Sequence, residues 1–266
     1  MTPATEEPLI VDKAGGVLAL TLNRPKVLNA LTLGMLEGLM ARLKEAERDP
    51  EVRCVVLSAA GRAFSAGADL GDLKARQAKG AFSLGDELRR HFNPLILQIR
   101  RMEKPVLASV QGLAAGAGAS LALACDLKLC AEEASFIPAF VKVGLAPDSG
   151  MSWTLPRHLG LAKALEHAWT AKPVSAADAL AAGLVNEVLP AYRLQAAVLE
   201  LARKLVEAPP RAVALTKRQM NRALEQGLEA QLDYEAKLQE ILGRTKDHAE
   251  GVSAFLEKRP ARFTGE

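Results

Sequence analysis

The order of strand-forming and helix-forming segments along the chain is the feature that most limits its fold. Four runs rich in apolar and β-branched residues are predicted strands. They lie within residues 15–25, 52–61, 104–112 and 127–136. Helical periodicity marks residues 32–49 and 83–103 between them, and a further strand is predicted within residues 184–190. The other segments after Gly160 have helical spacing. We therefore predict an α/β core followed by a helical C-terminal region.

Composition and charge exclude several classes of protein. The 266 residues are 49% hydrophobic and 24% charged, which is typical of a soluble globular enzyme. A net charge of +3 is far from that of a nucleic-acid coat, so no nucleic-acid partner is expected. No apolar run approaches the roughly 20 residues that span a bilayer, and the N-terminus lacks the pattern of a signal peptide. We expect a cytoplasmic protein without a membrane partner. Cys54, Cys125 and Cys130 lie in apolar runs and are predicted to be reduced core residues.

Three loops that follow predicted strands are rich in small residues. They are AFSAGADL at 63–70, the run at 111–126 and GLAPDSG at 144–150. Small side chains leave main-chain N–H groups uncovered and allow another molecule to approach the backbone. Two such N–H groups directed at one point would form an oxyanion hole. Packing of helices on a sheet through small residues is the alternative interpretation.

Other catalytic motifs are incomplete in this chain. The GAGASL run lacks the third glycine of a dinucleotide loop, because that position is Leu121. The AFSAG run around Ser65 is a variant of the nucleophile elbow of serine hydrolases. A hydrolase would also need a histidine, and none of the four histidines lies in a distinctive loop. Histidines and carboxylates show no metal-ligand spacing, so no metal is expected.

Asp148 is the acidic residue of the third loop, and three roles are open to it. Pro-Asp-Ser-Gly is a sequence typical of turns. Asp148 or Ser149 could also cap a helix that runs through residues 151–160. The third role is that of an acid/base group in a catalytic site.

Four segments, taken in order, resemble the enoyl-CoA hydratase/isomerase (crotonase) superfamily. They are LNRPKVLNAL at 22–31, GRAFSAGADL at 61–70, the run at 104–136, and GLAPDSGMSWTLPRHLG at 144–160. The resemblance extends from about residue 18 to the C-terminus. It implies a crotonase-like ββα spiral core over residues 1–205, and a helical region over 206–266 for oligomerisation and for covering coenzyme A. It also implies an acyl-CoA substrate, a homotrimer or homohexamer, and no cofactor beyond the coenzyme A of the substrate.

The resemblance also assigns roles to individual residues. Family members hold the thioester oxygen with two main-chain N–H groups, which fall on Ala68 and Ala117. The segment RPKVLN matches the loop that contacts the nucleotide end of coenzyme A, and FLEKR matches a stretch that covers coenzyme A from a neighbouring subunit. The implied substrate-binding residues are Lys26, Val27, Leu28, Ala66, Asp69, Leu70, Gly116, Gly118, Ser120, Phe140, Phe255 and Lys258.

Two positions depart from the pattern of a hydratase. Hydratases of the family use two glutamates on water, and the matching positions hold Ser120 and Phe140. Because addition of water needs a base and an acid, efficient hydration is not expected. Asp148 lies where many hydratases have glycine. A carboxylate in a dry pocket should have a raised pKa, and with an oxyanion hole it suffices to move a proton between two carbons.

The segments HFNPL, PDSGMSW, LTKRQMN and EGVSAFLEKRPARFTG narrow the resemblance to the phenylacetate-degradation branch. Members of this branch convert ring-1,2-epoxyphenylacetyl-CoA to an oxepin thioester and are similar in activity to Δ3,Δ2-enoyl-CoA isomerases. We therefore expect an acyl-CoA isomerase that uses Asp148 and the two main-chain donors. The alternatives are a fatty-acid enoyl-CoA isomerase, a weak hydratase, a serine hydrolase using Ser65, and a scaffold of this fold or an RNA-binding protein with a decayed site.

Overall fold

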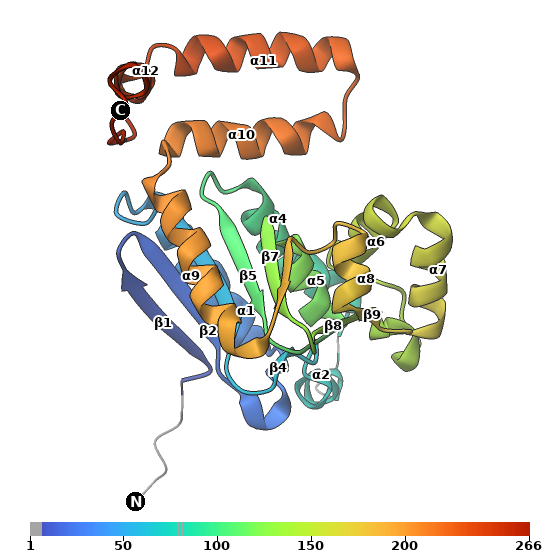
Figure 1. Cartoon of the computed structure of the whole chain (residues 1–266). Coiled ribbons are helices and arrows are strands. Elements are labelled where there is room, and N and C mark those ends of the chain that lie inside the picture. Colours follow the sequence, from blue (N-terminus) through green and yellow to red (C-terminus); the bar gives the residue numbers. More distant parts are fainter. Residues whose placement is uncertain (1–6, 79, 81) are drawn as a thin grey trace, which may run out of the picture.

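The computed structural model describes residues 7–78, 80 and 82–266, which fold around two β-sheets (Figure 1). The larger sheet has the strand order β1-β2-β3-β5-β7-β10, and the smaller sheet has the order β4-β6-β8-β9. The strands of the larger sheet are β1 Leu9–Ala14, β2 Val17–Leu22, β3 Cys54–Ala59, β5 Val106–Val110, β7 Leu127–Ala131 and β10 Glu187–Leu189. Those of the smaller sheet are β4 Ala63–Ser65, β6 Leu113–Ala115, β8 Ser135–Ile137 and β9 Val174–Ser175. The first six residues, where a signal peptide would begin, lie outside the described residues.

Successive passes of the chain add one strand to each sheet. Strand β3 leads into β4, β5 into β6, and β7 into β8. The strands β3, β5 and β7 are parallel to one another, and so are β4, β6 and β8. The carboxyl ends of the three short strands therefore lie along one edge of the smaller sheet. This edge carries the small-residue loops, because each of them follows one of these strands.

Helices cover the sheets and form the C-terminal region. They are α1 Leu33–Arg48, α2 Leu70–Gln77, α3 Leu84–Glu87, α4 Asn93–Arg101, α5 Ala117–Ala124, α6 Met151–Leu159, α7 Leu161–Thr170, α8 Ala176–Ala181, α9 Ala191–Glu207, α10 Pro210–Ala223, α11 Leu228–Leu242 and α12 Lys246–Glu257. Short 3-10 turns form at η1 Pro25–Val27 and η3 Ala139–Val143. In the part of the chain that the structure describes, no helix combines the length and the apolar character that a membrane crossing requires.

Local sequence accounts for two helix features. Thr32 caps α1, as its position predicted, and its hydroxyl oxygen accepts a hydrogen bond from the Met35 N–H at 3.4 Å. The helix predicted at 83–103 is present, but a π-helical turn, η2 Leu88–Phe92, interrupts it. Pro94 lies just after this turn and has no N–H to continue the regular pattern, which accounts for the interruption.

The short strands of the smaller sheet are where prediction from sequence was wrong. Strands β4 and β6 were placed in loops, and β8 was merged with β7 into one strand over residues 127–136. Strand β1 of the larger sheet was not predicted either. Gly15 and Gly16 form the tight turn from β1 into β2, and they have positive φ angles of 54° and 80°. Three-residue strands are too short to show an alternating pattern, so neighbouring strands have to define them.

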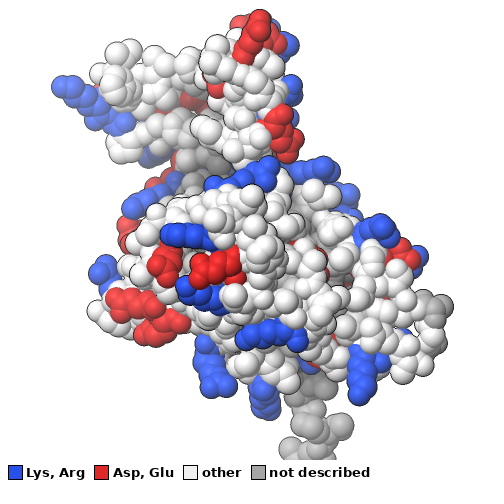
Figure 2. Space-filling view, turned by 90° about the vertical axis from the view of Figure 1, so that its right-hand side faces the viewer, with Lys and Arg blue, Asp and Glu red and all other residues white. Residues whose placement is uncertain are grey.

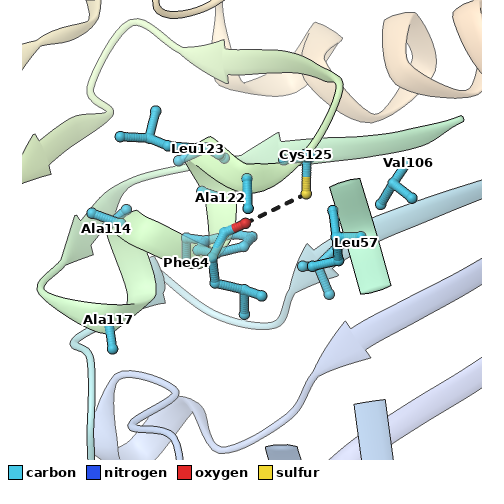
Figure 3. Packing of buried hydrophobic residues seen from close by; sticks show 14 of the residues in the cluster. Leu57, Phe64, Val106, Ala114, Ala117, Ala122, Leu123 and Cys125 are labelled. Carbon is cyan, nitrogen blue, oxygen red and sulfur yellow. Dashed lines mark hydrogen bonds between the residues drawn. The ribbon is translucent and has the colours of Figure 1, made fainter. Parts of the chain in front are cut away.

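Helix α5 lies at the centre of the main hydrophobic cluster. All eight of its residues are buried, and Phe64 and Ala114 pack beside it (Figure 3). Its small side chains allow the helix to approach the strands closely. The prediction that the cysteines are free core residues is confirmed. Cys125 donates to the Leu121 carbonyl at 3.5 Å, and burial raises the pKa of its thiol to about 12.

The C-terminal helices divide between two locations. Helix α9 packs on the larger sheet through Leu194, Val198 and Ala202. Helices α10, α11 and α12 form a separate lobe at the top of Figures 1 and 2. The predicted boundary between residues 205 and 206 falls in the last turn of α9.

A buried ion pair joins this lobe to the core. The Lys217 ammonium on α10 lies 2.7 Å from the Asp126 carboxylate, and the two side chains are 10% and 16% exposed. Lys217 also donates to the carbonyls of Ile99 and Lys104 at 2.8 and 3.1 Å. The same oxygen of Asp126 accepts the Val106 N–H at 2.8 Å. These hydrogen bonds compensate both groups for the loss of water.

Replacing Lys217 with methionine should destabilise the protein. Removing one partner leaves the Asp126 carboxylate buried and unpaired, so the free energy of unfolding should fall by roughly 3–5 kcal/mol. Urea denaturation measures this change. The double variant Lys217→Met/Asp126→Asn should recover part of the loss, because the asparagine carries no charge and its carbonyl can still accept the Val106 N–H. Equal stability of Lys217→Met and the wild type would contradict the prediction.

Candidate active site

The loop after β4 and the start of α5 touch main chain to main chain at two glycines. A Cβ atom added to Gly67 would lie 2.8 Å from the Ala115 carbonyl oxygen and 3.4 Å from the Ala117 nitrogen. One added to Gly118 would lie 2.6 Å from the Ser65 Cβ. Gly67 also has a φ of +96°, a conformation that favours glycine. Only glycine fits this contact, and the contact brings the two predicted oxyanion donors onto neighbouring segments.

The N–H of the first predicted donor, Ala68, forms no hydrogen bond within residues 7–78, 80 and 82–266. Ala68 forms an isolated parallel bridge with Leu31. In this bridge the Leu31 N–H donates to Gly67 at 2.7 Å, and the Asp69 N–H donates to Leu31 at 2.9 Å. The bridge therefore holds both neighbours of Ala68 and leaves its own N–H without an acceptor among the described residues.

The second predicted donor, Ala117, is the first residue of α5. The N–H groups at the start of a helix have no partner within it, and they carry its partial positive charge. In α5 the first N–H to find a carbonyl is that of Ser120, which donates to Gly116 at 3.0 Å. Gly116 has φ 50° and ψ −127°, an arrangement that suits glycine and turns the chain sharply into the helix. The N–H groups of Ala68 and Ala117 therefore both lack an acceptor among the described residues, and they lie on segments that touch each other.

Asp148 lies in a turn that α5 helps to hold. The Ser120 hydroxyl donates to the Asp148 carbonyl at 3.0 Å, and the Ser149 hydroxyl donates to the Asp148 carboxylate at 2.8 Å. Burial raises the pKa of Asp148 above its ordinary value of 3.8, and the hydrogen bond from Ser149 opposes this shift. The carboxyl group therefore binds a proton more readily than that of an exposed aspartate.

The helix-cap interpretation of this turn is wrong. The N-cap of α6 is Gly150, and no side chain caps the helix. The Ser149 hydroxyl bonds to the Asp148 carboxylate instead, with Ser149 itself at a φ of +52°. Asp148 contributes to the turn through its carbonyl, which accepts the Met151 N–H at 3.0 Å.

The comparisons with known proteins identify the family of the chain. The sequence profile described as enoyl-CoA hydratase/isomerase matches residues 12–266. The chain belongs to the enoyl-CoA hydratase/isomerase family. It is 42% identical to the 1,2-epoxyphenylacetyl-CoA isomerase of Escherichia coli K12 over 94% of this chain and 95% of that protein. It is 43% identical, with the same coverage, to a probable enoyl-CoA hydratase of Rhodobacter capsulatus.

A solved structure of the family has the same fold. It is that of a putative enoyl-CoA hydratase/isomerase from Mycobacterium abscessus, which is 33% identical and superposes with a TM-score of 0.92 over 97% of this chain and 100% of the other. The predicted crotonase-like α/β fold with a helical C-terminal region is therefore confirmed. The relatives include isomerases and hydratases, so family membership alone leaves the reaction open.

The two positions that the resemblance matches to hydratase glutamates are occupied by buried uncharged residues. Ser120 is 2% exposed, and its hydroxyl is bonded to main-chain carbonyls. Phe140 is 6% exposed and belongs to the main hydrophobic cluster. Both residues were expected to contact substrate. The structure places Ser120 as a support for the Asp148 turn and Phe140 in the hydrophobic core.

The predicted coenzyme A residues of the two N-terminal loops come together. The Ala66 N–H donates to the Leu28 carbonyl at 2.8 Å, which joins the loop after β4 to η1. Val27 and Leu70 are 47% and 53% exposed at this junction, and Lys26 is exposed as well. A surface with one cation and two apolar side chains is compatible with the nucleotide and pantetheine parts of coenzyme A.

Asp69 serves the fold more directly than it could serve a ligand. One carboxylate oxygen accepts a hydrogen bond from Arg24 at 2.8 Å, and the other accepts the N–H groups of Gly71 and Asp72 at 3.1 Å. The bond from Arg24 lowers the pKa of Asp69. Asp69 therefore caps α2, and its bond to Arg24 connects the loop that carries Ala68 to the η1 loop. The sequence did not reveal this role.

Ser65 does not have the environment of a nucleophile. It is fully buried, and its hydroxyl donates to the Asn29 carbonyl at 2.8 Å. None of the hydrogen bonds of the described residues joins it to a histidine. The structure thus argues against the serine hydrolase alternative. Residues 7–78, 80 and 82–266 also contain no cluster of three or more potential metal ligands.

Phe255 and Lys258 lie far from these loops in the same chain. They belong to the end of α12, in the lobe at the top of Figure 1, whereas β4 and α2 lie near the bottom. Phe255 is 83% exposed. One chain alone therefore does not bring them to the site.

A cavity of about 690 Å³ borders the Asp148 turn on its α6 side. Its walls include Ser120 and Ser149 together with the basic residues Arg100, Lys128 and Arg157. Sequence analysis singled out none of these basic residues, because they come from three separate elements and form no local motif.

Replacing Gly67 with alanine should disable the site. The added Cβ would meet the Ala115 carbonyl at 2.8 Å, so the loop that carries Ala68 must move. A displacement of about 1 Å can cost on the order of a hundredfold in turnover, and we expect a loss of that size. The control is Gly34→Ala, because Gly34 is exposed in α1 and a Cβ there would meet nothing within 4 Å. Acyl-CoA turnover and melting temperature should be measured for both variants, and wild-type turnover in Gly67→Ala would contradict the assignment.

Proposed function

We propose that this protein is an acyl-CoA isomerase in which Asp148 moves a proton and the N–H groups of Ala68 and Ala117 hold the thioester oxygen. Asp148 removes a proton from a carbon near the thioester, and the negative charge moves to the thioester oxygen. Two main-chain donors stabilise that charge, and one such donor is typically worth about 3–4 kcal/mol. Asp148 then returns the proton to another carbon, so the reaction is an isomerisation without net gain or loss of atoms.

The observation that carries the proposal is the distribution of carboxylates. Asp148 is half-buried with a raised pKa, while the buried residues Ser120 and Phe140 stand at the positions that the resemblance matches to hydratase glutamates. Hydration needs one group to activate water and another to protonate carbon. A single acid/base group is better suited to moving one proton within the substrate. This chemistry requires no metal or redox cofactor.

The substrate that we propose is ring-1,2-epoxyphenylacetyl-CoA, converted to its oxepin thioester, with Δ3,Δ2-enoyl-CoA isomerase activity in addition. Support comes from 42% identity to the 1,2-epoxyphenylacetyl-CoA isomerase of Escherichia coli over nearly the whole chain. The alternative is a fatty-acid enoyl-CoA isomerase or a weak hydratase, which is favoured by 43% identity to a probable enoyl-CoA hydratase.

We further propose that the active form is a homotrimer or homohexamer. In this arrangement α12 of one subunit covers the coenzyme A bound to the next. The exposed side chains of Val252, Phe255 and Leu256 on α12 support this, because they are 47%, 83% and 73% exposed in the single chain. Lys258 follows them at the C-cap of α12 and would supply a cation for a phosphate group.

The Asp148→Asn variant tests the proposed proton transfer. Asparagine keeps the shape of the side chain and cannot act as a base, so isomerisation of a 3-enoyl-CoA and of the ring epoxide should fall by about a hundredfold or more. The control is Asp233→Asn, which removes an exposed carboxylate of α11 and should leave turnover unchanged. Near-normal turnover by folded Asp148→Asn would refute the proposal. Hydration of 2-enoyl-CoA should be assayed in parallel, and hydration faster than isomerisation in the wild type would favour the hydratase alternative.

The pH dependence of kcat/KM gives a second test. The free enzyme needs ionised Asp148, so kcat/KM should rise with pH through the raised pKa of this residue. Ser149 donates a hydrogen bond that stabilises the carboxylate. Ser149→Ala should therefore raise the pKa further and move the acidic limb of the profile to higher pH. An unchanged limb in Ser149→Ala, with the protein folded throughout, would show that another group controls the profile.

A further inference from the structure

The Ser65 hydroxyl forms hydrogen bonds to two main-chain groups in a fully buried position. It donates to the Asn29 carbonyl at 2.8 Å and accepts the Gly67 N–H at 3.2 Å. Ser65 itself is 0% exposed, so substrate cannot reach this hydroxyl. The second of these bonds fixes the residue that directly precedes the Ala68 donor.

Asn29, which receives the bond from Ser65, is itself rigidly held. Its side-chain amide donates to the carbonyls of Ala60 and Ala63 at 2.8 Å each, and its amide oxygen accepts the Arg24 N–H at 2.7 Å. Asn29 is fully buried and has a φ of +53°, which these bonds maintain. The Ser65 hydroxyl is therefore bonded to the carbonyl of a residue that three hydrogen bonds hold in place.

Ser65 also touches the helix that carries the second donor. A Cβ added to Gly118 would lie 2.6 Å from both Cβ and Oγ of Ser65. Gly118 directly follows Ala117 in α5. One buried side chain therefore lies against the segments of both donors, bonded to one and packed against the other.

From this geometry we infer that Ser65 is a positioning residue for both oxyanion donors, and this inference rests on the proposed role of Ala68 and Ala117. Donors act only when they lie about 2.7–3.1 Å from the developing oxyanion. Loss of the hydroxyl would leave the Gly67 N–H and the Asn29 carbonyl buried without partners. The donor loop would then shift to satisfy them, and the donors would no longer converge on one oxygen.

The test measures the thioester carbonyl directly. Hexanoyl-CoA labelled with ¹³C at the thioester carbon cannot isomerise, and hydrogen bonds to its carbonyl lower the infrared stretching frequency of that bond. We expect a clear downshift on binding to the wild type and a smaller one on binding to Ser65→Ala. Turnover of 3-enoyl-CoA by Ser65→Ala should show kcat reduced by roughly tenfold to a hundredfold, with KM changed by less than about threefold, because the coenzyme A contacts remain.

Two further variants separate positioning from simple stability. Ser65→Cys keeps a weaker donor and acceptor, and it should give a carbonyl shift and a kcat between those of the wild type and Ser65→Ala. Ser58→Ala removes the partly buried hydrogen bond between the hydroxyls of Ser58 and Thr21, whose oxygens lie 2.9 Å apart. This control loses a comparable hydrogen bond outside the site and should keep the wild-type carbonyl shift and kcat.

The outcomes distinguish the inference from the proposed function beneath it. A wild type that produces no downshift lacks the oxyanion hole, and both then fail. A wild-type downshift that Ser65→Ala retains in full, with kcat within about twofold, overturns the inference about Ser65 alone. If Ser65→Ala does not fold, Ser65→Cys decides in the same way: a reduced downshift supports positioning, and an unchanged one refutes it.

Discussion

Direct contact between two backbone segments of the chain, at Gly67 and Gly118, is the constraint on which the rest of the candidate site depends. A side chain at either position would collide with backbone or with Ser65. The contact is possible because β4 and β6 are parallel neighbours whose carboxyl ends lie together. Ser65 supports this contact, and its hydroxyl donates a hydrogen bond to the Asn29 carbonyl. The N–H groups of Ala68 and Ala117 have no acceptor among the described residues, because of how the neighbouring backbone groups are bonded.

The carboxylates of the chain show how the same chemical group acquires different roles. Asp69 is fully engaged by Arg24 and the start of α2, and Asp126 is engaged by Lys217. Asp148 receives a hydrogen bond from the neutral Ser149, and no cation among the described residues forms an ion pair with it. Its charge is therefore balanced less well than that of the other two. Burial raises the pKa of both Asp148 and Asp126, but only at Asp126 does a nearby cation, Lys217, oppose this shift. This difference makes it suitable for moving a proton, whereas the others stabilise the fold.

The segments of the candidate site could be predicted from the sequence, but the contacts that support them could not. The two donor segments, the η1 loop and Asp148 were candidates, because small residues and motif order are visible in a linear chain. Strands β4 and β6 were not, because three residues show no periodicity and only their neighbours define them. Ser65 was considered as a nucleophile, since its motif resembles one, while its burial and its bond to Asn29 exist only after folding. Ser149 was considered as a helix cap, whereas its hydroxyl donates a hydrogen bond to the adjacent carboxylate of Asp148.

The sequence by itself determined the family, the α/β core with helices at its C-terminal end, and the absence of glutamates at positions 120 and 140. These properties depend on residue identity and order, which a linear chain displays in full. The tertiary structure alone decided which N–H groups remain free, which carboxylates are neutralised, and that Phe255 cannot reach the site of its own chain. Each of these depends on contacts between segments distant in sequence, because burial and hydrogen-bond partners are set by packing and no local pattern encodes them.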